Sequence, residues 1–249
     1  MNDSTHQSQT MTQNRSKDGT LGMRRDDFLQ RIRESLSPKG TDTFPLPPDA
    51  APMIDDNLVR LCRSDDDLIT RFAQSAEAVG MRVMRCDSQS LAATIDRCLV
   101  ELEPNCAVAS IQSESLRKGI LNLGKVPRAT EIVDSSTMEC FDEKFSFDVG
   151  ITDVDAVIAD SGSLVYSSGP NRSRGTFLVP PVHLAIVRAS QILPDLIDYW
   201  SDEDRGNELR SCASTVLITG PSKTADIEGV LVSGMHGPGE VRILLVTDA

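Results

Sequence analysis

The amino-acid sequence predicts an α/β fold in which helices flank a mixed, largely parallel sheet. Apolar segments of strand length alternate with amphipathic segments of helical period between residues 65 and 124, a pattern typical of right-handed βαβ units. Closely spaced strand-like segments follow between residues 155 and 246. The composition, with 39% hydrophobic and 25% charged residues among 249, fits a globular domain with an aliphatic core.

The first part of this domain is expected to alternate helices with strands. Its helices have apolar residues at helical spacing, and they are expected at residues 65–80, 88–102 and 113–124. The first of them should end at its last residue, a glycine, because glycine commonly follows the final turn of a helix. The strands are short apolar segments, expected at residues 81–86 and 106–110. Because a helix connects these two strands, they should run parallel.

The second part is richer in strands. Its apolar segments are separated by turns of Ser, Gly and Pro, or by a single helical stretch at residues 194–210. Strands are expected at residues 155–159, 163–167, 183–189, 214–220, 229–235 and 241–246. Open α/β sheets bind ligands at one edge, so we expect the functional loops to gather there.

The amino-terminal region differs from this domain in composition. Residues 1–22 are polar and are expected to form a disordered tail. Residues 23–54 should contain a short helix over 24–36, whose apolar residues recur every four positions, followed by a Pro-rich linker. One compact domain is then expected over residues 55–249.

Charge and cysteine content exclude several classes of function. The formal net charge of −12 disfavours nucleic acids and anionic membranes as partners, because both bind basic surfaces. No apolar run reaches the roughly 18 residues of a membrane span. The six cysteines lack metal-binding spacing, so we expect no metal and no iron–sulfur cluster in this chain. The polar first twenty residues lack the apolar core of a signal peptide and predict a cytoplasmic protein.

One stretch of the sequence carries cations but no acids. Residues 161–192 contain no Asp or Glu, although Arg172, Arg174, Arg188 and His183 lie among them. Part of this stretch is a Gly- and Ser-rich turn whose backbone N–H groups and arginines suit an anion. The alternative is that buried strands exclude acids and that the turn is a solvated hairpin tip. The candidate ligands here are Ser161, Ser168, Arg172, Arg174 and His183.

A second candidate loop, residues 220–228, joins a strand to a helical turn expected near Ala225. It partly matches a phosphate-binding loop but lacks the Gly-Lys-Ser/Thr sequence, so a nucleoside triphosphatase is excluded. Hydroxyl and free N–H groups at the start of a helix, together with one lysine, favour an anion, although helix capping explains the same residues. The candidate ligands are Ser222, Lys223 and Thr224.

Two further residues are candidates for proton transfer. His236 lies among glycines, where a histidine is either a hydrogen-bonded turn residue or part of a site. Asp160 follows a predicted strand and precedes a tight turn, where a carboxylate can act as a nucleophile or base, or can pair with an arginine. His183, at the start of a strand, is likewise either a buried structural residue or a ligand.

The same loops carry a resemblance to a known family. The segments GITDVDAVIADSGSLVYSSGPNRSRGTFLVPPVHLAIVRASQILPDL (150–196) and TGPSKTADIEGVLVSGMHGPGEVRILLV (219–246) resemble the LUD domain of the lactate-utilization protein C type (LutC/YkgG). On this resemblance the compact domain, residues 55–249, is a LUD domain. The chain departs from the family pattern at Asp160-Ser161-Gly162, where the family usually has Glu-Thr-Gly. The shorter carboxylate argues against covalent catalysis at this position.

The resemblance implies a fold related to NagB, ribose-5-phosphate isomerase (RpiA) and the CoA transferases. It also implies a role in oxidising L-lactate to pyruvate beside two iron–sulfur partner proteins, since members of this type hold no cluster themselves. The leading hypothesis is a cytoplasmic subunit of a lactate-oxidising system whose loop edge binds a small anion, such as lactate, pyruvate or a phosphorylated cofactor.

Two alternatives to this hypothesis stay open. One is a non-catalytic assembly or regulatory subunit that docks through the short amino-terminal helix and the linker. The other is an independent transferase or isomerase that acts on a phosphorylated or CoA-linked substrate. The sequence therefore leaves open whether the chain by itself is an enzyme.

Overall fold

The computed structural model of the protein describes residues 24–36, 60–123, 130–138, 146–169, 172–202, 212–225 and 231–249. Backbone contacts divide the chain into two units, Met1–Ile54 and Asp55–Ala249. The predicted tail, residues 1–22, and the predicted Pro-rich linker lie outside the described residues.

The described part of the first unit is a single helix, α1 (Arg25–Leu36), at the position that the sequence predicts. Two acids in its first turn and Arg33 in its last turn match the helix dipole. Its apolar stripe is exposed, with 54% of Phe28 and 39% of Ile32 accessible to solvent. The helix therefore presents an apolar surface that no described residue of its own unit covers.

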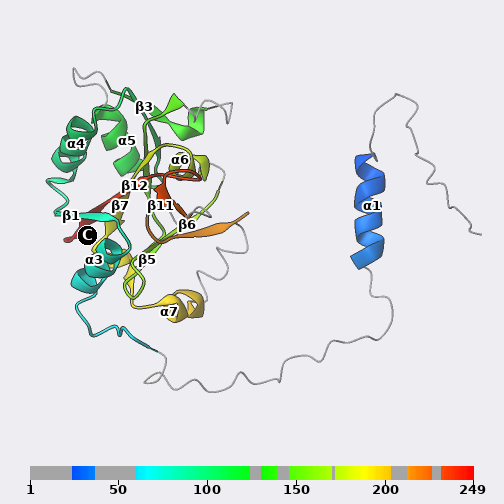
Figure 1. Ribbon diagram of the computed structural model, residues 1–249, viewed down its shortest axis with the longest axis horizontal. Helices are drawn as coiled ribbons and strands as arrows, with labels where there is room; N and C mark the ends of the chain where they lie inside the picture. Colours follow the sequence, from blue (N-terminus) through cyan, green and yellow to red (C-terminus); the bar gives the residue numbers. More distant parts are fainter. Residues whose placement is uncertain are drawn as a thin grey trace, which may run out of the picture. The chain divides into compact units, whose positions relative to one another are not determined.

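The second unit is built on a six-stranded sheet in which all neighbouring strands run parallel. In spatial order its strands are β1 (Arg82–Cys86), β12 (Glu240–Val246), β7 (Val182–Arg188), β4 (Val149–Asp153), β2 (Cys106–Ser110) and β3 (Glu131–Asp134) (Figure 1). The last strand of the unit thus pairs with its first. Because all six strands run the same way, their carboxyl ends form one edge of the sheet.

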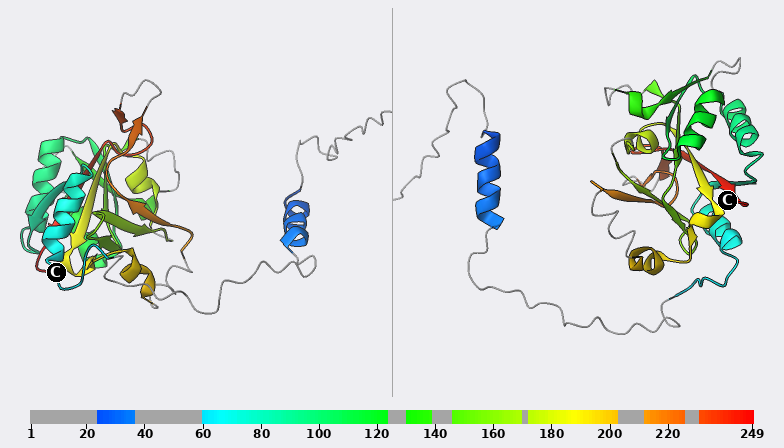
Figure 2. Two further views of the ribbon diagram at one scale, coloured as in Figure 1. Left: turned by 60° about the horizontal axis from the view of Figure 1, so that its bottom comes forward. Right: turned by 180° about the vertical axis from the view of Figure 1, so that it is seen from behind.

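Two helices cover one face of this sheet. They are α4 (Leu91–Leu102), between β1 and β2, and α5 (Glu114–Leu123), between β2 and β3, and they lie side by side (Figures 1 and 2). Ile95 of α4 and Ile120 of α5 are buried in one core with Leu184 of β7. Each helix follows a parallel strand and therefore begins at the carboxyl edge of the sheet.

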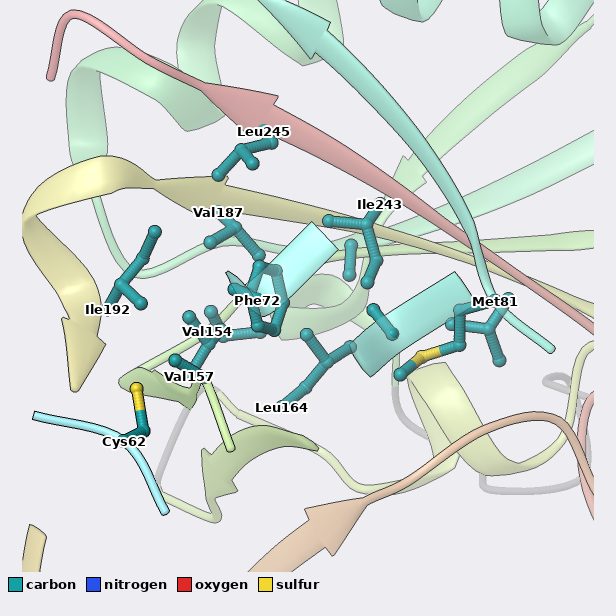
Figure 3. Close-up of a cluster of buried hydrophobic side chains, with 14 residues drawn as sticks. Cys62, Phe72, Met81, Val154, Val157, Leu164, Val187, Ile192, Ile243 and Leu245 are labelled. Atoms are coloured by element: carbon teal, nitrogen blue, oxygen red, sulfur yellow. The ribbon is translucent and has the colours of Figure 1, made fainter. Parts of the chain in front are cut away.

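Helix α3 (Leu68–Ala78) and a smaller sheet cover the other face. The smaller sheet has four strands, in the order β8 (Ile192–Leu193), β5 (Ala156–Ile158), β6 (Ser163–Ser167) and β9 (Thr215–Ile218). Its β5 and β8 are parallel, and its other pairs are antiparallel. In the core between these layers, Phe72 of α3 is fully buried beside Val154, Leu164 and Val187 (Figure 3).

Two glycines allow the layers to approach closely. Gly162, in the turn between β5 and β6, has a φ of +68°, and a Cβ there would lie 2.4 Å from the backbone N of Ala76 in α3. Gly150 of β4 lies against α6 (Gly175–Leu178), where a Cβ would lie 1.7 Å from the carbonyl O of Thr176. A larger residue at either position would force these layers apart.

The remaining elements of the second unit are short. Helix α7 (Leu196–Ser201) packs Tyr199 on the face of the small sheet that points away from α3. Strand β10 (Lys223–Ala225) pairs with β11 (Leu231–Ser233) in a separate antiparallel pair. Two single 3₁₀ turns, Ser135–Thr137 and Ala189–Gln191, follow β3 and β7. None of the described helices combines the length and the hydrophobicity that a membrane crossing requires.

The predicted fold class, α/β with a mixed, largely parallel sheet and flanking helices, is confirmed. Each predicted strand has a counterpart among the described residues, but β3, β4, β8 and β10 were not predicted. The helical turn expected near Ala225 is wrong, because Lys223–Ala225 is a strand. The helical stretch expected over 194–210 is α7 as far as Ser201, and its continuation lies outside the described residues.

Candidate functional site

A pocket of about 430 Å³ lies at the carboxyl edge of the large sheet, on the face that α4 and α5 cover. Four separate parts of the second unit line it: the region around the start of α4, the start of α5, the end of β7 and the end of β12 with the residues that follow it. The lining residues are Ser88, Leu91, Ser113, Ser115, Leu116, Ile186, Arg188, Val246 and Ala249. Open α/β sheets bind ligands at this position.

Arg188 is the cation of this pocket. It is the last residue of β7, it is partly buried, and its side chain makes no ion pair with a described residue. Its backbone N–H donates to Gln191 Oε1 (2.9 Å), and Gln191 Nε2 donates to the carbonyl O of Val154 (2.6 Å), which fixes the turn after β7. A guanidinium without a carboxylate partner in a pocket wall suits a carboxylate or phosphate ligand.

Hydroxyl groups lie near the starts of both helices that border the pocket. Ser113 and Ser115 share a hydrogen bond of 3.2 Å at the start of α5, which leaves one of their two hydroxyl protons for a ligand. Ser88 instead donates its N–H and its hydroxyl to Asp248 Oδ1 (2.7 and 2.9 Å), which ties the β1–α4 connection to the end of the chain. The rest of the wall is mainly aliphatic, so the pocket combines one cation with an apolar floor.

Asp153 holds the α5 side of the pocket in place. It is the last residue of β4 and is 3% exposed. Its carboxylate accepts the backbone N–H groups of Gln112 (3.0 Å to each oxygen) and Ser113 (3.3 Å). These bonds satisfy N–H groups just before the first turn of α5. Asp153 therefore positions Ser113 without lining the pocket.

Arg172, a candidate anion ligand, already has a carboxylate partner. Its guanidinium forms an ion pair with Asp155 and donates to the carbonyl O of Asp153 (3.4 Å). It also lies over the ring of Tyr166, 4.2 Å from the centroid, and Tyr166 shares a hydrogen bond of 3.1 Å with Ser110. Burial lowers the pKa of Arg172, but Asp155, Tyr166 and Asp153 together more than offset this, so that pKa lies above its ordinary value. The charge of Arg172 is matched within the protein.

His183, another candidate ligand, is a fully buried residue of β7. Its Nε2 lies 2.8 Å from Thr152 Oγ1, and its ring is 5.7 Å from that of Phe177. Burial lowers the pKa of His183 to about 3, because no nearby charge stabilises the imidazolium form in the core. The imidazole is therefore neutral at physiological pH and has the environment of a structural histidine.

Asp160 and Ser161 lie on the α3 side of the small sheet. Asp160 Oδ1 is 3.6 Å from Arg71 Nη2 in a partly exposed ion pair. The hydroxyl of Ser161 bonds Ser163 Oγ (2.7 Å), which in turn bonds Thr219 Oγ1 (2.7 Å). The carboxylate of Asp160 thus has an arginine partner. The hydroxyl of Ser161 belongs to a series of hydrogen bonds that links β6 to the residue after β9.

The other candidates of the acid-free turn have different environments. Ser168 Oγ donates to the carbonyl O of Ser214 (3.1 Å) and accepts the N–H of the same residue (3.1 Å), so it joins the ends of β6 and β9. Arg174 is exposed at the start of α6. Residues 170 and 171, in the middle of the turn, lie outside the described residues.

The candidates of the second loop form a separate group. Ser222 Oγ accepts the backbone N–H of the exposed His236 (3.3 Å). Lys223 Nζ donates to the carbonyl O of Val79 at the end of α3 (3.2 Å), where a cation complements the helix dipole. Thr224 is partly buried in β10. The structure thus brings Ser222 and His236 together and directs the side chain of Lys223 to the end of α3, but none of the three lines the pocket beside Arg188.

The residues of the pocket are not among those that the sequence singles out as ligands. Arg188 stands in the acid-free stretch, and Ser88 and Ser113 follow predicted strands by two and three residues. Such positions are a usable signal, because polar residues that directly follow parallel strands gather at one edge of a sheet. The positions of the strands in the sequence do not show which strands are neighbours in the sheet, so the sequence alone does not predict that these residues lie in one pocket.

Comparisons with known proteins agree with the resemblance. The family model of the LUD domain matches residues 69–246. A protein from Exiguobacterium sp. (strain AT1b), named lactate utilization protein C, is 31% identical over 233 residues, which cover 90% of this chain and 96% of that protein. A protein of the same name from Halalkalibacterium halodurans is 28% identical over 233 residues, 90% of this chain and 98% of that protein.

A solved structure has a related fold. The crystal structure of a DUF162 family protein from Deinococcus radiodurans matches with a TM-score of 0.52 at 15% identity, over 72% of this chain and 96% of that chain. At this level of identity the likeness concerns the fold alone. The family match covers most of the chain, and the Exiguobacterium protein aligns over nearly its whole length. The chain therefore belongs to the LUD domain family, and proteins named lactate utilization protein C are among its relatives.

Proposed function

We propose that this protein takes part in lactate utilization, as a subunit that binds a small anion and works with iron–sulfur partner proteins. Its relatives over nearly full length carry the name lactate utilization protein C, which supports the pathway. The observation that supports a small anion as the ligand concerns Arg188. This residue is a cation in the wall of the pocket at the carboxyl edge of the large sheet, and it has no carboxylate partner among the described residues.

The lining of the pocket suits a small organic acid. The guanidinium of Arg188 can hold a carboxylate through two parallel N–H···O bonds. The Ser113 and Ser115 pair, together with the N–H groups at the start of α5, offers donors to a second polar group such as a hydroxyl or keto oxygen. The aliphatic floor suits the carbon end of the ligand. The volume also accommodates a larger anion than lactate, such as a phosphorylated cofactor.

The described lining favours binding over proton transfer. It contains no His, Asp or Glu side chain, and neither candidate for proton transfer lines it: Asp160 pairs with Arg71, and His236 lies beside Ser222. Oxidation of lactate requires a base and an electron acceptor. We therefore assign the electron transfer to iron–sulfur partners and the recognition of the anion to this chain.

Calorimetry tests the anion site. The full chain is titrated with lactate, pyruvate, inorganic phosphate and CoA, and the ligand that binds is then titrated into Arg188→Ala and Arg174→Ala. Because a hydrogen-bonded charge contributes about 1.5–3 kcal/mol, Arg188→Ala should weaken binding roughly 10- to 150-fold. Arg174→Ala removes the same charge from an exposed position outside the lining and should leave affinity unchanged. Equal affinity of the two variants would overturn the site.

One observation favours the alternative of an assembly subunit. Phe28 and Ile32 of α1 expose an apolar stripe that the described residues of the first unit do not cover. Replacing both with Ser tests this role, because loss of co-purification with the iron–sulfur proteins, with anion binding retained, would assign docking to α1. Substrate turnover by the purified chain alone would instead favour the independent transferase or isomerase.

A further inference from the structure

Among the described residues, the six-stranded and four-stranded sheets of the second unit have four edge strands, and three of these carry protective features. Strand β1 has the exposed charges of Arg82 and Arg85, and β3 carries Glu131 and Asp134. Strand β8 is only two residues long. Charges and short length are devices by which proteins keep sheet edges from pairing with other chains. The fourth edge, β9, has none of them.

Strand β9 is uncharged over its whole length and beyond both its ends. Residues 211–222 read SCASTVLITGPS and contain no Asp, Glu, Lys or Arg. The strand itself, Thr215–Ile218, contains no proline, and its side chains are partly or largely exposed, with Leu217 at 42%. It lies at the outer margin of the small sheet, where Figures 1 and 2 show it in orange.

The pairing of β9 with β6 fixes which of its backbone groups point outward. Ser168 N–H donates to the carbonyl O of Ser214 (2.9 Å), so these opposite residues form a hydrogen-bonded pair of the antiparallel ladder. Such pairs alternate with pairs whose N–H and C=O groups point away from each other. Thr215 and Leu217 belong to this second kind. The 3.1 Å bond between the hydroxyls of Ser167 and Thr215 agrees, because side chains are closer in such pairs.

The outward N–H and C=O groups of Thr215 and Leu217 have no strand partner among the described residues. Continuing the same alternation, the N–H and C=O groups of Thr219 also point away from β6. The edge therefore presents outward groups at three alternate residues, with the exposed Leu217 at their centre. This row is symmetric about Leu217, as a strand must be if it is to pair with itself in antiparallel orientation.

We propose that β9 is the dimer interface of this protein and that it pairs with β9 of a second copy. A two-fold axis through Leu217 places Leu217 opposite Leu217 of the second copy, and Thr215 opposite Thr219 of the second copy. Each of these opposite pairs exchanges two backbone hydrogen bonds. The small sheets of the two copies then form one continuous sheet, and the two Leu217 side chains cover each other.

The charge of the chain favours a second copy at this edge over contacts elsewhere. Two copies that each carry a net charge of −12 repel one another over most of their surfaces. The uncharged residues 212–222 are where their backbones can approach without that repulsion. The pairing buries a small area, so the dimer should be weak and should dissociate on dilution. It requires neither the proposed anion nor an iron–sulfur partner.

Sedimentation velocity on the full chain over a range of protein concentrations tests this interface. The parent chain should shift from monomer to dimer as concentration rises. Leu217→Lys should stay monomeric, because two like charges would face each other across the axis. Leu178→Lys is the matched control, since Leu178 is equally exposed (41%) but lies in α6, and it should dimerise like the parent. A parent that is monomeric throughout, or a dimer that survives Leu217→Lys, would overturn the proposal.

Cysteine cross-linking tests the register independently of stability. In a hydrogen-bonded antiparallel pair the Cα atoms are about 5.5 Å apart, within the range of a disulfide, so Leu217→Cys should give a covalent dimer under mild oxidation. Val216→Cys is the control. Its side chain points to the opposite face of the strand, and the proposed register sets it opposite residue 218 of the second copy, so it should give little covalent dimer. Equal cross-linking of both variants would exclude a two-fold axis at Leu217.

Discussion

At the residue scale, the partner of a side chain decides its role more than its type does. Arg172 and Arg188 lie in the same acid-free stretch of sequence. Arg172 is stacked on Tyr166 and paired with Asp155, whereas Arg188 ends β7 beside a pocket without an acid partner among the described residues. Asp155 precedes Arg172 by 17 residues and meets it only through the fold. No local pattern in the sequence distinguishes the two arginines.

His183 gives a residue-scale prediction about pH. The folded-state pKa of about 3 lies below the ordinary value of 6.5, so below pH 6.5 the unfolded chain binds a proton that the folded chain does not. The folded state is therefore destabilised as pH falls from 6.5 towards 3. Between pH 7 and pH 5 the buried histidine should cost roughly 2 kcal/mol of stability.

Urea unfolding of the parent and of His183→Gln at pH 7 and pH 5 measures this contribution. The variant lacks the titrating group and should lose roughly 2 kcal/mol less than the parent over this interval. It should also be less stable at pH 7, because it disturbs the contacts with Thr152 and Phe177. The same pH dependence in both proteins would show that His183 is accessible to protons in the folded state.

At the element scale, hydrophobic period predicts long elements well and short ones poorly. The helices α3, α4 and α5 follow the expected ranges, because each has an apolar face that the core covers. Strand β4 escapes prediction because Gly150 interrupts its apolar pattern, and that glycine is required where α6 touches the sheet. Strand β10 has a polar sequence, and only its pairing with β11 makes it a strand.

The contact between α3 and the small sheet gives an element-scale prediction. Gly162→Ala should destabilise the protein by at least about 2 kcal/mol, because φ is +68° and the new Cβ would meet the backbone of Ala76. Gly119→Ala in α5 is the matched control. Nothing lies within 4 Å of its added Cβ, so it should stabilise the helix by about 0.5–1 kcal/mol.

The measurement is the free energy of unfolding of both alanine variants beside the parent. Opposite signs for the two substitutions are expected. If Gly162→Ala were as harmless as Gly119→Ala, the turn between β5 and β6 would not be packed against α3.

At the scale of the whole molecule, sequence reasoning finds the fold class and the family but not the pocket. The alternation of periods and the resemblance both point to the α/β fold, because they are properties of contiguous segments. The pocket joins Ser88, Ser113, Arg188 and Val246, which meet because the strands that precede or contain them lie in the order β1-β12-β7-β4-β2. Strand order is a long-range property that local spacing does not encode. None of the candidate ligands that the sequence singles out lines this pocket.

The division into two units gives a prediction for the whole molecule. Every residue of the three buried hydrophobic clusters lies between Cys62 and Val246, inside the second unit. A chain that lacks residues 1–54 should therefore keep the fold of the second unit, with an unfolding free energy within about 0.5 kcal/mol of the full chain, because no cluster loses a side chain. Equilibrium urea unfolding of the two chains checks this.

The shortened chain also separates the proposed roles of the two units. Anion binding through Arg188 and dimerisation through β9 belong to the second unit and should be retained, whereas docking through the apolar stripe of α1 should be lost. Calorimetry, sedimentation velocity and co-purification with iron–sulfur partners measure the three properties separately. A large loss of stability on removing residues 1–54 would contradict the prediction that the second unit folds independently.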